Sequence, residues 1–423
     1  MHSSDPGTIH IVGAGLAGLA AAVQLAPSRR PVVIHEATAQ AGGRCRSYYD
    51  QATGMTIDNG THLVLSGNTS VLSFLETVGS ESGLQGPAEA EFSFADLATQ
   101  ERWTLRIGEG RIPWWIFDKA RRVPQTGLAD YLPLARLLYM SADRRLEEVM
   151  ECAGPVYERM LAPLLLAALN IEPRRASSQL AATLIRETLG QGGKACRPLL
   201  AQGGLGKVFV TPAVDYLQSH GIQIRFEDEL QGIRFLGKRA VQLEFTSGVT
   251  PLGRHDAVIL ALPPHAAKKL VPSLPAPTQF RGIVNAHFRI DPPTAMPAML
   301  GVINGTSEWI FGLEGRIAVT ISDAERLFDE PRPALAERLW KEIVALTGLP
   351  PALPPWQIVR ERRATFAATP EQNALRPPAE TAWHNFFLAG DWTATGLPAT
   401  LEGAVRSGFR AADLVAHAAR VAA

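Results

Sequence analysis

The stretch Ile9-His10-Ile11-Val12-Gly13-Ala14-Gly15-Leu16-Ala17-Gly18 decides the fold of this chain. A short β-rich run leads directly into a glycine turn, and the Ala- and Leu-rich residues 19–26 that follow are typical of a helix. In such a unit Gly13 permits a tight turn, Gly15 lets the backbone approach a pyrophosphate, and Gly18 lets the helix pack on the strand. The positive end of the helix then faces the anion.

An acidic residue follows at the spacing that a bound ribose requires. A second apolar run, residues 31–34, leads to His35 and Glu36, so that the acid lies 18 positions beyond Gly18. Its carboxylate can accept hydrogen bonds from ribose hydroxyls. A glycine turn alone would also fit a plain strand–helix connection, but turn, helix and acid together predict dinucleotide binding.

Two further segments carry related signals. Gly42-Gly43-Arg44-Cys45-Arg46 brings two arginines toward the same phosphate region, where they can neutralise a pyrophosphate; two solvated arginines after a turn are the alternative. Near the other end, the apolar run 386–389 leads to Gly390-Asp391, and residues 397–404 open a helix. Taken alone, this second segment would indicate only a turn and a helix cap.

Composition excludes several classes of protein. The 423 residues favour two or three lobes, and 41 Lys and Arg against 41 Asp and Glu leave no basic field for nucleic acid. Three distant cysteines, Cys45, Cys152 and Cys196, predict structural thiols and no metal site. A polar amino terminus, and no apolar run of about 18 residues, predict a cytoplasmic protein.

The two ends together resemble the FAD-containing amine oxidase and carotenoid desaturase superfamily. This resemblance implies an α/β fold, with a Rossmann-like FAD-binding domain and an inserted α+β substrate domain. We expect residues 1–70, 195–270 and 380–423 to form the FAD-binding domain, and residues 71–194 and 271–379 to form the substrate domain, its first half mostly helical.

The resemblance also implies the FAD contacts. Asp391 would bind the ribityl or phosphate part, the following helix start would face the N1 and O2 edge of the flavin, and Leu230 would contact adenine through its backbone. The full set of expected FAD-binding residues is Gly13, Gly15, Leu16, Ala17, Gly18, Glu36, Ala37, Gly43, Arg44, Gly60, Thr61, Leu230, Gly390, Asp391, Pro398, Thr400 and Leu401.

A narrower resemblance is to the hydroxysqualene dehydroxylase family of bacterial hopanoid biosynthesis. It rests on the motifs at 58–62 (Asp-Asn-Gly-Thr-His), 307–311, 363–370 and 389–404. The implied reaction removes a hydroxyl group from a long isoprenoid, and hydride from reduced flavin then gives squalene. Thr61 departs from the Gln expected before His62. No second glycine-turn unit with a downstream acid appears, so we expect an external electron donor.

The departing hydroxyl group needs a proton donor, and His62 is our candidate. An unperturbed pKa of about 6.5 lets a histidine donate near neutral pH. The alternative is that His62 only hydrogen-bonds the flavin or the backbone. Asp58 would then hold either His62 or the turn.

Residues 111–145 combine aromatic and basic side chains, including Trp114 and Trp115. Seven basic and three acidic residues suggest a helical region at a membrane interface, whereas a core stripe and a solvated face would produce the same pattern. Peripheral contact with the inner face of a membrane is therefore one expectation.

Alternative functions remain open at this point. They are a carotenoid-type desaturase of a long isoprenoid hydrocarbon and a non-catalytic prenyl-chain-binding protein of the same fold. An amine oxidase is less favoured, because no aromatic or acidic cage for an amine is evident.

Overall fold

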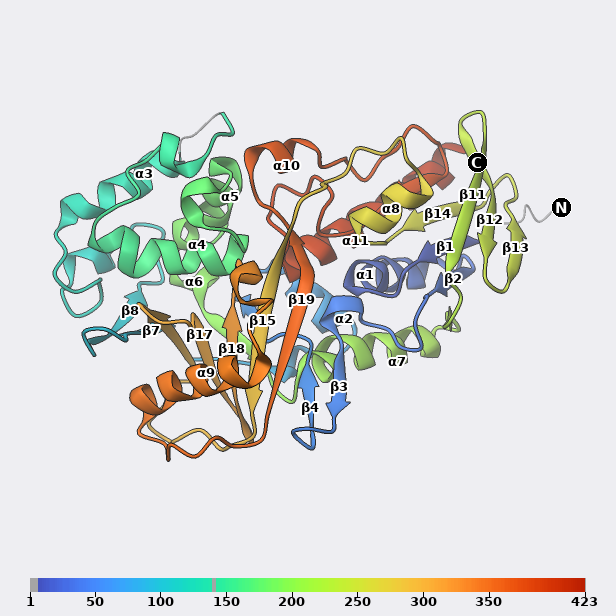
Figure 1. The fold of residues 1–423 in the computed structure, drawn as a ribbon. Helices are drawn as coiled ribbons and strands as arrows, with labels where there is room; N and C mark the ends of the chain where they lie inside the picture. Colours follow the sequence, from blue (N-terminus) through green and yellow to red (C-terminus); the bar gives the residue numbers. More distant parts are fainter. Residues whose placement is uncertain (1–6, 139–141, 423) are drawn as a thin grey trace.

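The computed structural model describes residues 7–138 and 142–422. Residues 1–6, 139–141 and 423 lie outside this description. They include both ends of the expected FAD-binding domain and three residues near the end of region 111–145. The described chain is built around two large sheets, one at each side of the molecule in Figure 1.

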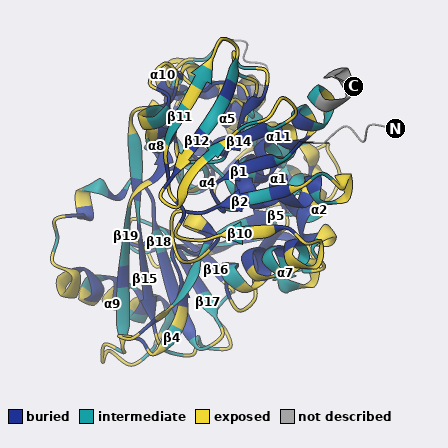
Figure 2. Ribbon diagram, turned by 90° about the vertical axis from the view of Figure 1, so that its right-hand side faces the viewer, coloured by how far each residue is buried: buried dark blue, intermediate teal, exposed yellow. Residues whose placement is uncertain are grey.

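The first sheet is parallel and carries the glycine turn. Its order is β10-β2-β1-β14-β20. The central strands β1 and β14 are apolar and buried along their whole length because both faces are covered, and Figure 2 shows β1 largely buried. They are β10 (Gln223–Arg225), β2 (Val32–His35), β1 (Ile9–Val12), β14 (Ala257–Leu260) and β20 (Phe386–Leu388).

The glycine turn has the expected geometry. Gly13 has φ +105°, a conformation that other residues rarely adopt. A Cβ atom at Gly18, in helix α1 (Leu16–Leu25), would lie 1.9 Å from the Gly13 carbonyl oxygen. On its other side α1 packs against α11 (Leu401–Ala422), where a Cβ at Gly408 would lie 2.3 Å from the carbonyl oxygen of Ala17. The predicted turn and the close packing are confirmed.

The second sheet has seven strands in the order β19-β15-β18-β17-β16-β7-β8. Helix α9 (Arg332–Thr347) covers it with a buried stripe that includes Leu339 and Trp340. The strands are β19 (Trp356–Phe366), β15 (Phe280–Phe288), β18 (Arg316–Ile321), β17 (Trp309–Leu313), β16 (Met299–Ile303), β7 (Ala90–Asp96) and β8 (Arg102–Ile107).

The expected strands within residues 283–322 are present, and most elements in the first half of the expected substrate domain are helices, with one hairpin among them. Residues 90–107 form the β7–β8 hairpin, and β7 joins the sheet through parallel pairing with β16. Alternate side chains of this hairpin, such as Phe92 and Phe94, are buried, which is the period of a strand rather than of a helix.

Smaller strands and helices complete the fold. The strands are β3 (Ser47–Asp50), β4 (Met55–Asp58), β5 (Leu63–Leu65), β6 (Leu84–Gln85), β9 (Pro198–Ala201), β11 (Leu230–Leu236), β12 (Arg239–Phe245) and β13 (Gly248–Pro251). The helices are α2 (Thr69–Thr77), α3 (Leu132–Leu138), α4 (Ala162–Leu169), α5 (Ser178–Glu187), α6 (Gly193–Cys196), α7 (Thr211–Ser219), α8 (Pro264–Leu270) and α10 (Pro370–Ala374).

Sheet membership supports the expected division of the chain, which we retain as a proposal. The parallel sheet draws on residues 9–35, 223–260 and 386–388, and the seven-stranded sheet draws on residues 90–107 and 280–366. Cys45, Cys152 and Cys196 are buried and free. Within the described ranges, no helix has both the length and the apolar character needed to cross a bilayer.

Candidate active site

Glu36, the acidic residue after β2, is hydrogen-bonded to the glycine turn. One carboxylate oxygen of Glu36 accepts a hydrogen bond from the backbone N–H of Ala14 (2.8 Å), and the other accepts from the backbone N–H and the hydroxyl of Thr38. Gly42 donates its N–H to the carbonyl oxygen of Ala14 (2.8 Å). The predicted glycine turn, acid and Gly-Gly segment therefore surround one point at the carboxyl ends of β1 and β2.

The start of α1 fits a pyrophosphate. In the described chain no side chain caps this helix and no acid lies in its first turn, so its first N–H groups keep their positive field. A Cβ atom added to Gly15 would find no heavy atom within 4 Å, although Gly18 one turn later has no room at all. This open cradle at a helix N-terminus matches the shape and charge of a diphosphate.

Arg44 links this cradle to the other end of the chain. Its guanidinium forms an ion pair with Asp391 (2.8 Å) and also donates to the carbonyl oxygen of Ala364. Desolvation opposes the charge on Arg44, but Asp391 and Glu361 outweigh it and raise the pKa of Arg44 above its ordinary value. The side chain is nevertheless 40% exposed, so Arg44 remains accessible to a ligand.

The carboxy-terminal motif is fixed by side-chain hydroxyls. Gly390 donates its N–H to the hydroxyl of Ser407 (3.0 Å), which in turn contacts the hydroxyl of Thr393 (2.7 Å). Thr400 caps α11, since its hydroxyl accepts the N–H of Gly403 (3.0 Å). This places Pro398, Thr400 and Leu401 at the start of α11, after the loop that carries Asp391.

The 58–62 segment forms a turn that is held by β3, by the loop before α7 and by the seven-stranded sheet. One carboxylate oxygen of Asp58 accepts from the hydroxyl of Ser47 (2.5 Å) and the N–H of Leu205 (2.8 Å), and the other pairs with Arg316 of β18 (2.9 Å). Asp58 and Arg316 are both buried. Of the alternatives left open by the sequence, the structure favours Asp58 as the residue that holds the turn.

His62 lies in a small hollow next to this turn. The polar part of the lining comes from Asp58, Thr61 and His62, and the apolar part from Leu200, Ala201, Leu205 and Leu313. Desolvation lowers the pKa of the His62 imidazole below its ordinary value; Asp58 opposes this shift and Arg44 adds to it. The Thr61 hydroxyl is buried and has no hydrogen-bond partner in the described protein.

The expected adenine-binding segment lies near the acid. The N–H of Asp228 donates to the carbonyl oxygen of Glu36 (2.9 Å), and Leu230 begins β11 two residues later. Asp228 also accepts a hydrogen bond from His35 (2.8 Å), an arrangement that the sequence analysis did not anticipate. Ala37 follows Glu36 on the exposed side of this segment.

Other residues at the site were also missed. Arg316 and Arg376 bind the two motif loops, and Asn285 donates to the carbonyl oxygen of Asn59 (3.3 Å). Arg316 and Asn285 lie 258 and 226 positions from the residues that they contact, and Arg376 lies 15–17 positions before the loop that it contacts, outside the motif itself. Sequence spacing alone gives no signal for such partners.

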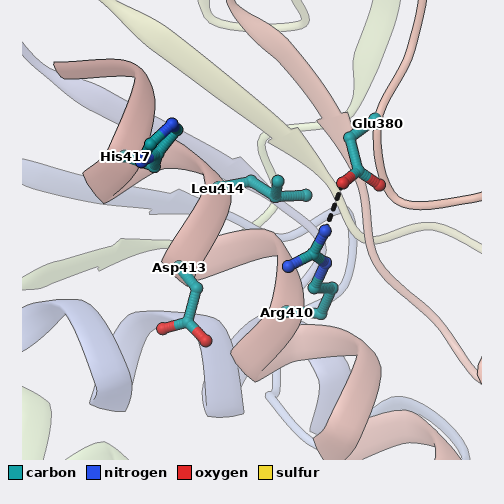
Figure 3. Close-up of a pocket in the computed structure, with 5 residues that line it drawn as sticks. All are labelled: Glu380, Arg410, Asp413, Leu414 and His417. Carbon is teal, nitrogen blue, oxygen red and sulfur yellow. Dashed lines mark hydrogen bonds and ion pairs between the residues drawn. The ribbon is translucent and has the colours of Figure 1, made fainter. Parts of the chain in front are cut away.

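A larger hollow, of about 550 Å³, lies elsewhere, along the second half of α11. Figure 3 shows that its wall includes the ion pair between Arg410 and Glu380. The lining is mostly charged and includes no predicted site residue, so its size does not make it the active site. The lining residues are Glu380, Arg410, Asp413, Leu414 and His417.

Gly15→Ala provides a test of the cradle. The added methyl group meets no protein atom, so the thermal midpoint of FAD-free protein should stay unchanged, while the lost approach to phosphate should weaken FAD binding about tenfold or more. Fluorescence titration with FAD measures the affinity. Gly110→Ala, where a methyl group also enters open space, is the control; equal affinity in both variants would contradict the assignment.

Comparison with known proteins agrees with this geometry. The family "Flavin containing amine oxidoreductase" matches residues 16–416. A hydroxysqualene dehydroxylase of Rhodopseudomonas palustris is 53% identical, over 98% of this chain and 99% of that protein. A 15-cis-phytoene desaturase of Synechococcus elongatus is 22% identical, over 96% of this chain and 95% of that protein. A cyclohexylamine oxidase structure from Brevibacterium oxydans shares the fold, with a TM-score of 0.72 at 16% identity, over 97% of this chain and 99% of that one. The chain therefore belongs to the hydroxysqualene dehydroxylase family, within the FAD-dependent flavin containing amine oxidoreductases.

Proposed function

We propose that this FAD-dependent oxidoreductase removes the hydroxyl group of hydroxysqualene reductively and releases squalene, as a step of hopanoid biosynthesis. The observation that carries the proposal is the convergence of the glycine turn, Arg44 and Asp391 around one cradle, with His62 in a largely apolar hollow beside it. Membership of the hydroxysqualene dehydroxylase family supports the substrate class. The desaturase alternative is not favoured, because its sequence relatives are distant.

The expected cofactor contacts follow from this geometry. Gly15 and the first N–H groups of α1 would hold the pyrophosphate with Arg44, and Glu36 would accept the ribose hydroxyls. The α11 start would face the flavin edge, and Leu230 would lie at the adenine. Reduced FAD, when bound, supplies hydride, and an external electron donor must regenerate it.

The chain's own residues would assist loss of the hydroxyl group. Hydroxide is a poor leaving group, so protonation by His62 lets the C–O bond break with release of water and leaves a cation on the substrate carbon. Leu200, Leu205 and Leu313 would keep bulk water away from that cation, since water would return the alcohol. Asp58, fixed by Arg316, would keep the turn that bears His62 in place.

We also propose peripheral contact with a membrane. Trp114 and Phe117 are 67% and 59% exposed, with ring centroids 5.8 Å apart, and Ile112 and Leu132 are exposed in the same region. Arg111, Lys119 and Arg136 are exposed among them. Such an apolar patch with a basic rim suits an anionic lipid surface. Figure 1 places nearby α3 at the end of the molecule away from β13.

Trp115 does not share this exposure. It is buried and packs edge-on against Tyr131, with ring centroids 5.6 Å apart. Of the two neighbouring tryptophans, Trp114 therefore belongs to the proposed lipid-facing patch and Trp115 to the core. The two alternatives left open by the sequence apply to different side chains.

Product analysis tests the reaction. Anaerobically reduced enzyme incubated with hydroxysqualene should form squalene, with one flavin reoxidised per squalene formed. Gas chromatography and the flavin absorbance band report the two quantities. Flavin that stays reduced in the presence of hydroxysqualene, or flavin reoxidation without squalene, would contradict the proposal.

The pH dependence tests His62. Only the protonated imidazole donates, and its pKa lies below 6.5, so the single-turnover rate should fall about tenfold per pH unit between pH 7 and 8. His62→Gln should lose about 100-fold in rate and flatten this slope. His220→Gln changes an exposed histidine at the end of α7. This variant should keep the wild-type rate and its pH dependence. A wild-type rate that is constant over this range would remove His62 from the acid role.

Liposome flotation tests the membrane contact. Trp114→Ala with Phe117→Ala should lower partitioning onto vesicles containing phosphatidylglycerol about tenfold or more, because two aromatic groups that would enter the lipid interface are lost. Tyr49→Ala is the matched control, as Tyr49 is also 67% exposed but lies on β3. Equal partitioning of the double variant and the control would refute the assignment.

A further inference from the structure

Arg376 is a buried cation beneath the carboxy-terminal flavin motif. It follows α10 and is 7% exposed. Its guanidinium donates to the carbonyl oxygens of Asp391 (3.3 Å), Trp392 (3.4 Å) and Thr393, three successive residues of the motif loop. It also donates to the hydroxyl of Thr395 (3.1 Å). A single side chain thus fixes the backbone of the whole loop.

The charge of Arg376 has no carboxylate bonded to it. Every hydrogen-bond acceptor of Arg376 in the described chain is neutral, including Asn373, and its cation also lies 4.8 Å from the ring centre of Phe366. The one nearby carboxylate, Asp391, is bonded to Arg44 instead. Burial lowers the pKa of Arg376 to about 10, against the attraction of Asp391, so the group stays charged at neutral pH.

Burying such a cation is costly, because it loses its hydration. Neutral carbonyl groups compensate for that loss less well than a carboxylate does. Arg44, which pairs with the same loop, shows the contrast, since both Asp391 and Glu361 raise its pKa. A backbone clamp alone does not need a charge. The uncompensated charge is therefore the feature that calls for a functional reason.

We propose that Arg376 is a positioning residue that also tunes the flavin: it fixes the loop 391–393, and its charge favours the reduced, anionic form of FAD. A fixed positive charge in a low-dielectric site stabilises added negative charge. Reduction of the flavin by an external electron donor thereby becomes more favourable. The inference rests on FAD binding by this motif, and it does not depend on the identity of the isoprenoid substrate.

Reduction potentials of three holoenzyme variants test the proposal. Arg376→Gln removes the charge, and the ratio of affinities for reduced and oxidised FAD should fall about tenfold, equivalent to a potential about 30 mV more negative for a two-electron couple. Arg376→Lys keeps the charge but loses the planar set of guanidinium N–H donors. Affinity for oxidised and reduced FAD should therefore fall, while the potential at pH 7 stays near wild type. Arg410→Gln, an exposed arginine on α11, should leave the potential unchanged (Figure 3).

Two outcomes would overturn the tuning role. One is an Arg376→Gln enzyme that binds both forms of FAD more weakly by the same factor, since a structural clamp alone predicts that result. If the Gln variant fails to retain FAD, the Lys variant decides: a buried lysine loses its proton as pH rises, so its potential should fall below wild type toward pH 9.5. Parallel curves from pH 6 to 9.5 would refute the proposal. Failure to make squalene at normal potentials would instead contradict only the proposed substrate.

Discussion

The ion pair between Arg44 and Asp391 joins residues that are 347 positions apart. It forms because β2, β1, β14 and β20 are neighbours in one parallel sheet, and parallel strands bring their carboxyl ends to a common edge. Gly15 and Glu36 lie at the same edge, after β1 and β2. The site therefore exists only once this sheet has formed, so the fold and the cofactor cradle are one physical constraint.

Features that depend on neighbouring residues could be predicted from the sequence. The turn at Gly13 and the close packing at Gly18 are examples, because both are decided within a few residues. The β7–β8 hairpin could not be predicted in the same way. Its strand partner β16 lies about 200 residues further along the chain, and the short aromatic run around Phe92 and Phe94 carried no motif that drew attention to it. Trp114 and Trp115 show the same limit on a smaller scale, since adjacent indoles have opposite exposure.

The candidate site shows the same difference between local features and long-range contacts. Its motif residues could be named from the sequence, whereas the partners that hold them could not. Arg316 supports Asp58 from 258 positions away, and Asp228 supports Glu36 from the connection between β10 and β11. The proposed roles of the motif residues toward FAD stay predictions. What the structure adds is a physical reason for each of them to occupy its position.

The seam along which the turn at residues 58–62 packs on the seven-stranded sheet limits how substrate can enter. Asp58 and Arg316 are 4% and 8% exposed at the side chain, and Asn285 also crosses the seam to the carbonyl oxygen of Asn59. Opening the seam would separate a buried ion pair, and stranding either charge costs about 3–5 kcal/mol. A hinge motion at the turn that carries His62 would also disrupt the proposed site that the substrate must reach. A long isoprenoid would therefore approach through the proposed substrate domain with the seam closed, and residues 112–132 of this proposed domain also carry exposed apolar side chains.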